Sequence, residues 1–318
     1  MRTVTLFGRA VIIAGLLAAA APVFAQAWLP PKGEASVFFG YQFLYSREHL
    51  LEDGSRLAIR GQVRTSTLTA DLGYAVSDRV SLRVGLPYVI GRYSGDRGHP
   101  TYIDDKSYHG NFQDFRFEAR FNAVRAPLVV TPFAGVVWPS HDYEFFGHAA
   151  PGRRLREGLV GVNLARRLDP VLPNAYVHAR YAHSFVQRVL GIHHDRSDVD
   201  LELGYFATPT LTLRTFGAWE FPHGGIQDPS QILAPPRGTG TPEIFIHHDQ
   251  ITAEGHFNLG FGTAYAATRN VDVFLSAIRT LSGKNAHAID VAVLAGVAVS
   301  FSPAQMFRKH SALSPSHP

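Results

Sequence analysis

The feature that most constrains this chain is an alternation of apolar and polar side chains with period two, which runs through almost all of it after residue 33. In the segment 114–123, for example, Phe115, Phe117 and Phe121 alternate with charged residues. Successive side chains of a β-strand point to opposite faces, so the pattern predicts strands with one apolar and one polar face. Helix-period stretches are absent after the first 25 residues, and we therefore predict an all-β protein.

About twelve such segments follow one another. They lie near 34–47, 62–75, 79–92, 113–123, 128–139, 158–167, 175–188, 198–207, 210–221, 250–265, 270–281 and 288–301. Short connections, such as 76–79 and 208–209, alternate with long polar ones, such as 93–112 and 222–249. Outer-membrane β-barrels have short periplasmic turns and long outer loops. We therefore predict a single transmembrane antiparallel barrel of about twelve strands over residues 26–301.

The two faces of these strands have different chemistry. A lipid-embedded barrel is apolar outside and polar inside, whereas a soluble barrel would have the two faces exchanged. The parity of the loops, the number of strands and an export signal favour the membrane version. Tyr74, Tyr205 and Tyr265 fall at turn-side ends of strands, and Trp138 and Phe185 fall near loop-side ends. Aromatic residues are typical of both membrane interfaces, although they also favour strands in general.

Charged residues on the polar face are candidates for lining the lumen. We expect nine of them there: Arg83, Arg116, Glu118, Arg120, Arg180, Asp200, Glu202, Arg214 and Glu254. These side chains either border a water-filled path or fill the lumen as ion pairs, because about twelve strands lie between filled eight-stranded barrels and open porins. The balance of both signs argues against strong selectivity for cations or anions.

The N-terminal 25 residues read as a cleaved signal peptide. Arg2 and Arg9 form a basic region, 10–21 is apolar, and Ala25 ends a cleavage site. A membrane anchor is disfavoured because the apolar run is short and Pro22 follows it. We expect the mature chain to begin near Gln26, and residues 302–318 to form a disordered periplasmic tail. The predicted location is the outer membrane.

Composition removes several classes of function. The chain has 318 residues and no cysteine, which excludes disulfides, thiol catalysis and cysteine-bound metals. The formal charge is +4, and two of these charges belong to the signal peptide, so the sequence does not predict nucleic-acid binding. It contains no serine-hydrolase elbow, zinc-protease helix or phosphate loop, and we predict no enzyme activity and no cofactor. His183 and Ser184 are neighbours, so a strand points them to opposite faces.

Histidine is unusually common, with sixteen in the chain. Eleven fall in the expected outer loops: His49, His99, His109, His141, His148, His193, His194, His223, His247, His248 and His287. The tripeptide His-His-Asp occurs at 193–195 and at 247–249. Imidazole is a common metal ligand, but loop histidines are more often simply solvated, and we assign no metal site. Metal scavenging by these two tripeptides stays open as a weaker alternative.

One proline lies inside the expected wall. Pro87 falls in the middle of the segment 79–92, where it removes one donor from the ladder. The structural interpretation is a bulge or a kink. The functional hypothesis is a lateral opening between strands through which apolar solutes leave, and it requires unpaired backbone groups around Pro87.

Several strings resemble an outer-membrane family named after the MetA (meta-cleavage) pathway of phenol degradation. They are 74–88 (YAVSDRVSLRVGLPY), 113–116 (QDFR), 147–153 (GHAAPGR), 280–287 (TLSGKNAH) and the strand end 299–301 (VSF). The resemblance implies a β-barrel transporter for small, partly apolar molecules. It implies no ligand residues, because the family has no agreed set.

The sequence thus predicts a channel or transporter for passive passage or uptake of small solutes, including aromatic or apolar ones. The expected partners are the outer-membrane lipid bilayer, a small-molecule solute and, during biogenesis, the barrel-assembly machinery. One alternative is a non-conducting barrel with a structural, adhesive or ligand-sensing role, whose loop 222–249 binds a partner. A lipid-modifying membrane enzyme is a less favoured alternative.

Overall fold

The computed structural model describes residues 27–96, 98–236 and 238–303. It contains fourteen strands, a short 3-10 helix η1 (Tyr102–Asp104) and one α-helix, α1 (Pro242–Ile251). The strands are β1 (Ala35–Leu50), β2 (Arg56–Ser77), β3 (Val80–Gly95), β4 (His109–Phe112), β5 (Asp114–Phe121), β6 (Val129–Pro139), β7 (Glu157–Arg167), β8 (Ala175–Val186), β9 (His194–Phe206), β10 (Leu211–Gly224), β11 (Gly255–Ala266), β12 (Val271–Lys284), β13 (Ala286–Ala288) and β14 (Val291–Phe301). The predicted signal peptide and the tail after residue 303 lie outside the described residues.

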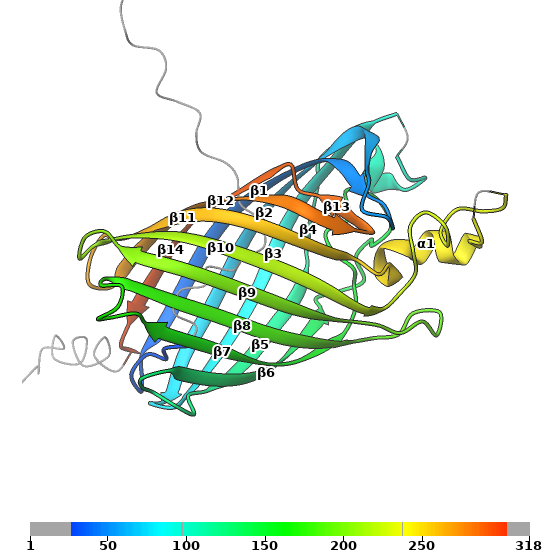
Figure 1. The fold of residues 1–318 in the computed structure, drawn as a ribbon. Coiled ribbons are helices and arrows are strands. Elements are labelled where there is room, and N and C mark those ends of the chain that lie inside the picture. Colours follow the sequence, from blue (N-terminus) through cyan, green and yellow to red (C-terminus); the bar gives the residue numbers. More distant parts are fainter. Residues whose placement is uncertain (1–26, 97, 237, 304–318) are drawn as a thin grey trace, which may run out of the picture.

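Twelve of the strands close into one antiparallel barrel (Figure 1). Each pairs with its neighbour in the chain, except that the short β4 and β13 attach beside β3 and β1. Closure comes from β1, which pairs with β2 on one side and with β14 on the other, in a register that places Ala35 opposite Phe301. The predicted all-β barrel of about twelve strands is confirmed.

Many large apolar side chains of the wall point outward, while others, such as Phe38 and Phe274, are buried in the interior. Phe39 is 60% exposed, Leu72 is 55% exposed and Phe261 is 61% exposed, while Glu202 and Arg214 on interior faces are almost fully buried. Such an inside-out distribution would be costly in water, but it suits a wall that contacts lipid. The membrane version of the predicted barrel is therefore the correct one.

Aromatic side chains mark both ends of this apolar wall. Tyr74, Tyr205 and Tyr265 are about half exposed at the short-turn end, and Trp138 and Phe185 are about half exposed toward the long-loop end. Amphipathic rings favour the level of the lipid headgroups. The two sets therefore bracket the part of the wall that lies in the membrane.

A charge on the lipid face tests this orientation. Leu201 lies on the outer face of β9 and is 46% exposed. We expect Leu201→Arg to lower the free energy of unfolding in phospholipid vesicles by about 2–4 kcal/mol, because a guanidinium is poorly solvated in the hydrocarbon layer. Urea titration of both proteins in vesicles measures the difference. Leu201→Phe is the control and should change it little, and equal effects of Arg and Phe would place Leu201 outside the bilayer.

The helix α1 corrects the sequence-based prediction. No helix was expected after the signal peptide, and a strand was expected from residue 250. Instead, Thr241 caps the helix by accepting a hydrogen bond from the Ile244 amide, and Pro242 occupies the first turn, where its missing N–H is not needed. The helix is ten residues long, too short for a clear helical period in the sequence. No helix within the described ranges has the length and hydrophobicity needed to cross a membrane.

Pro87 lies at a break in the neighbouring strand. The ladder between β2 and β3 continues through Pro87, which pairs with Thr69 without a change of register. On its other side, Gln113 separates β4 from β5, and the Gln113 amide donates a 2.9 Å hydrogen bond to the Pro87 carbonyl. The wall is therefore joined on both sides of the proline. Gly85 faces Arg116 and Tyr88 faces Phe112, so the partner segment has one extra residue opposite Pro87, which is a bulge. The structural interpretation is correct, and the hypothesis of a lateral opening at Pro87 is wrong.

Candidate functional site

Ion pairs cross the lumen between strands that are not neighbours. An Arg180 nitrogen on β8 lies 2.9 Å from a Glu118 oxygen on β5, and Arg120 pairs with the same carboxylate. Two strands separate β5 from β8 in the wall, so these side chains meet only inside the barrel. Arg180 also lies over the Phe133 ring, 3.8 Å from its centre. Nearby, Arg83 and Asp71 form a pair at 2.5 Å. We call the five charged residues Asp71, Arg83, Glu118, Arg120 and Arg180 the lower charge cluster.

A second group, on β8, β9, β10 and β12, is more deeply buried. Arg214 on β10 lies 3.0 Å from Glu202 on β9, and their side chains are 2% and 1% exposed. The Tyr176 hydroxyl donates to Glu202 at 2.5 Å, and Arg214 donates to the Ser276 hydroxyl on β12 at 2.7 Å. This last contact passes over β11 at Gly262, where a Cβ atom would lie only 2.5 Å from the Ser276 side chain.

The structure places the nine predicted residues as follows. Six belong to these two groups: Arg83, Glu118, Arg120, Arg180, Glu202 and Arg214. Arg116 lies on the same face of β5 as Glu118, and its side chain is exposed to the interior space. Asp200 shares the interior face of β9 with Glu202. Glu254 precedes β11 instead of lying within a strand, and its carboxylate is 3.7 Å from His256.

The sequence pattern missed charged residues that form ion pairs in the part of the lumen near the long connections. Glu157, at the start of β7, pairs with Arg196 at 2.7 Å and with Arg153 at 3.5 Å. Both Glu157 and Arg153 fall in a segment predicted to be an outer loop, where the alternation gives no face assignment. Asp71 was also missed, although it alternates with apolar residues along β2 and the same signal identifies it.

The segment before β1 turns into the barrel at the short-turn end. Ala27 is fully buried, and its carbonyl accepts hydrogen bonds from Thr131 at 2.6 Å and from Asn122 at 3.1 Å. The Trp28 ring lies edge-on to Tyr176, with centroids 6.2 Å apart. These contacts join residues next to β1 with strands on the far part of the wall. The segment therefore narrows the opening at this end.

The long connections, including the one that contains α1, lie at the other end of the barrel (Figure 1). His99 follows β3, and its ring stacks on His248 of α1, which lies between β10 and β11, with centroids 5.3 Å apart. Five strands separate β3 from β10 whichever way the ring is followed, so these connections start from opposite walls. Their contact means that the chain crosses the outer mouth. We call the connections that meet there, beginning with those between β3 and β4 and between β10 and β11, the outer crossing.

Five histidines from five segments form the centre of this outer crossing. His148, from the connection between β6 and β7, contacts His99 at a ring distance of 4.4 Å and His287 of β13 at 6.0 Å. His287 in turn stacks on His49 of β1 at 4.6 Å. Burial, followed by the neighbouring histidines, holds the pKa of His287 well below its usual range, so this imidazole is neutral at pH 7. We call His49, His99, His148, His248 and His287 the histidine cluster.

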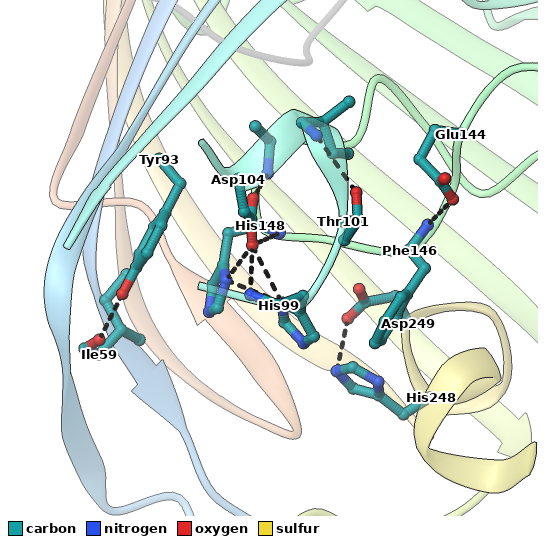
Figure 2. A network of polar contacts seen from close by, with 12 residues as sticks. Ile59, Tyr93, His99, Thr101, Asp104, Glu144, Phe146, His148, His248 and Asp249 are labelled. Carbon is teal, nitrogen blue, oxygen red and sulfur yellow. Dashed lines mark hydrogen bonds and ion pairs between the residues drawn. The ribbon is translucent and has the colours of Figure 1, made fainter. Parts of the chain in front are cut away.

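Asp104 of η1 lies against two of these rings (Figure 2). Its Oδ2 atom is 3.2 Å from His99 Nδ1 and 3.0 Å from His148 Nδ1. Burial by itself raises the pKa of Asp104, but hydrogen bonds from His148 and His99 outweigh it and hold this pKa well below its usual range. The carboxylate is therefore ionised at neutral pH.

The two His-His-Asp tripeptides are not brought together. The one at 247–249 is part of α1, and its His248 joins the histidine cluster. The other leads into β9, where Asp195 pairs with His193 at 2.9 Å. Within the described residues, the one group of three possible metal ligands is His99, Asp104 and His148, which includes neither tripeptide. Sequence spacing does not reveal this group, because His148 is far from the other two in the chain.

A solved structure of similar fold agrees with this architecture. The alignment with an outer-membrane channel from Pseudomonas putida F1 covers 87% of this chain and 98% of that protein, with 12% sequence identity and a TM-score of 0.65. The alignment with the translocator domain of the autotransporter NalP from Neisseria meningitidis covers 86% of this chain and 90% of that domain, with 10% sequence identity and a TM-score of 0.48. The alignment with the KdgM porin covers 84% of this chain and 99% of the porin, with 9% sequence identity and a TM-score of 0.44.

The chain has the fold of an outer-membrane β-barrel channel. At 12% identity the likeness to the Pseudomonas channel concerns the fold alone. No protein-family model matches the sequence, and no curated protein matches it. The resemblance to the phenol-degradation family therefore stays a prediction, while the outer-membrane barrel architecture that it implies is confirmed.

Proposed function

We propose that this protein is a channel for passive passage or uptake of small solutes across the outer membrane. The observation that carries the proposal is a polar, charged interior inside a closed wall with an apolar outer face. In the proposed path, solutes pass the nine predicted charged residues, of which Arg116 is the most accessible from the interior. The channel fold of the Pseudomonas protein supports the same function.

An apolar cavity beside the outer crossing supports small aromatic or apolar compounds as solutes. It has a volume of about 680 Å³. Its lining includes Tyr102, Phe145, Phe146, Pro242, Phe245 and Ile246. A cavity of this size and composition matches a small organic molecule. We propose that it holds such solutes before they enter the lumen.

Conductance in a planar bilayer tests the proposal. Refolded full-length protein is compared with a variant in which residues 227–250, including most of α1, are replaced by a short Gly-Ser linker. Reproducible current steps from the intact protein support an aqueous path, and steps from the variant alone identify the outer crossing as a gate. A folded barrel that is silent in both forms, and that does not increase uptake of an aromatic solute into vesicles, contradicts the channel and favours the non-conducting, loop-binding alternative.

We also propose that residues 1–25 are removed during export and that the barrel-assembly machinery inserts the mature chain. The basic residues Arg2 and Arg9, the apolar run 10–21 and the cleavage site that ends at Ala25 support this processing. The N-terminal sequence of protein purified from outer membranes should begin at or near Gln26. Recovery of the intact N-terminus from folded barrels would contradict this processing.

A cluster of polar side chains on the lipid-facing side of the barrel is relevant to the alternative of a lipid-modifying enzyme. The Ser197 hydroxyl lies 3.1 Å from His183 Nδ1 and 2.8 Å from His223 Nε2, and Asp195 Oδ2 lies 3.9 Å from His183 Nε2. However, Ser197 lies within β9 and is paired on both sides, with β8 and with β10, so its amide is not free to stabilise an oxyanion. We therefore expect no lipid hydrolysis. Turnover of a phospholipid that is lost in Ser197→Ala but kept in Ser184→Ala would overturn this.

A further inference from the structure

We propose that His99, Asp104 and His148 bind one divalent transition-metal ion of the zinc type at the outer mouth. The site lies in the connections at the mouth and not in the lumen, and this proposal does not rest on the solute path proposed above. His99 and Asp104 belong to the connection between β3 and β4, and His148 belongs to the connection between β6 and β7. A bound ion would therefore join two connections that cross the mouth.

The three possible ligand atoms form a nearly regular triangle. His99 Nδ1 and His148 Nδ1 are 2.9 Å apart, and they lie 3.2 Å and 3.0 Å from Asp104 Oδ2. Ligands on one face of a tetrahedral zinc ion are about 3.3 Å apart, since Zn–N and Zn–O bonds are about 2.0–2.1 Å long. Small outward movements of the side chains would complete the geometry.

All three atoms can offer a lone pair to one cation. Without an ion, each Nδ1 can carry the imidazole's proton and donate it to the Asp104 carboxylate, which carries only lone pairs. When that proton is on Nε2 instead, both Nδ1 lone pairs and an Asp104 lone pair converge on one point. A metal ion then takes the place of the two bridging protons, in a site from which water is largely excluded.

The surrounding structure holds the ligands in place. Main-chain amides of His99, His148 and Ala149 donate to the Asp104 carboxylate at 2.8, 3.2 and 3.1 Å. The His148 ring stacks on Tyr93 with centroids 4.3 Å apart, and Phe146 lies edge-on to His99 at 4.6 Å. Supporting contacts of this kind orient metal ligands and reduce the cost of ordering them when the ion binds.

The site is buried but reachable. The side chain of Asp104 is 0% exposed, while those of His99 and His148 are 10% and 14% exposed. Figure 2 shows His248 of α1 next to the His99 ring, with Asp249 paired to His248. Both ring nitrogens of His248 have partners, because Nδ1 lies 2.6 Å from the Phe245 carbonyl and Nε2 lies 3.1 Å from Asp249, so three protein ligands leave a fourth position for water. Two nitrogen ligands and one oxygen ligand suit Zn²⁺ better than Mg²⁺ or Ca²⁺, which prefer oxygen.

Zinc titration of the full-length refolded protein tests this site. The protein is first stripped with a chelator, and zinc chloride is then added in a calorimeter. We expect one tight site per chain, and a loss of affinity of about a hundredfold or more in His99→Ala and in His148→Ala, since even a supporting residue changes affinity by about 10–100-fold. His193→Ala is the matched control, because His193 is an exposed histidine with its own aspartate partner. Its affinity should equal that of the unchanged protein.

Two outcomes would overturn the proposal. One is the absence of stoichiometric binding, which would leave a proton-bridged triad. The other is equal weakening in His193→Ala and His148→Ala, which would indicate adventitious binding by surface histidines. If the His148 variant does not fold, cobalt replaces zinc in the unchanged protein. An intense visible absorption band of tetrahedral Co²⁺ supports the site, and the weak band of octahedral Co²⁺ contradicts it.

Discussion

Replacement of Glu118 by glutamine should make the proposed channel prefer anions, with the chloride-to-potassium permeability ratio rising about fivefold. Glu118 neutralises both Arg120 and Arg180 in the lower charge cluster. Without its charge, three arginines face the single carboxylate of Asp71. One unit charge at about 8 Å changes the energy of a passing ion by ~0.5 kcal/mol in water, with opposite sign for chloride and potassium, so the ratio of their permeabilities changes by ~1 kcal/mol, or about fivefold.

The reversal potential under a salt gradient measures this change. Asp53→Asn is the control, because Asp53 is an exposed carboxylate in the connection between β1 and β2 and does not face the lumen. The control should leave the reversal potential unchanged. An equal potential in the unchanged protein and in Glu118→Gln would show that ions do not pass the lower charge cluster, and would contradict the proposed path.

Removal of Arg214 should be the most destabilising change in the lumen. The side chains of Arg214 and Glu202 are 2% and 1% exposed, so Arg214→Ala leaves a buried carboxylate without its cation. We expect the free energy of unfolding to fall by about 3–5 kcal/mol, because the desolvation of Glu202 is no longer compensated. Urea titration in phospholipid vesicles at neutral pH measures the loss.

A double variant separates the charge effect from the loss of packing. Arg214→Met combined with Glu202→Gln removes both charges and keeps an acceptor for the Tyr176 hydroxyl. It should recover most of the stability, since a neutral pair of similar size costs little in place of a buried ion pair. Arg269→Ala, in the exposed turn between β11 and β12, serves as the control. A loss in Arg214→Ala no larger than in this control would contradict the buried pairing.

The sequence alone predicted the wall of the barrel. Alternation is a local property, since each strand residue points opposite to its neighbour whatever the rest of the chain does. It therefore assigned Glu118 and Arg120 to the polar face of their strand and Phe117 to the apolar face. The parity of loop lengths predicted the closed antiparallel order, and with it the lipid-facing exterior. The prediction failed where local pattern is weak, as in the ten-residue helix α1.

Only the tertiary structure decided which polar residues meet. Arg180 reaches Glu118 because closure of the barrel brings β8 and β5 to the same interior space, and no spacing in the sequence encodes that distance. The outer crossing shows the same limit more strongly. His148 reaches His99 and Asp104 through irregular connections, whose course depends on packing against loops from the opposite wall. Local periodicity determines the face on which a side chain lies, whereas closure and loop packing determine its partners.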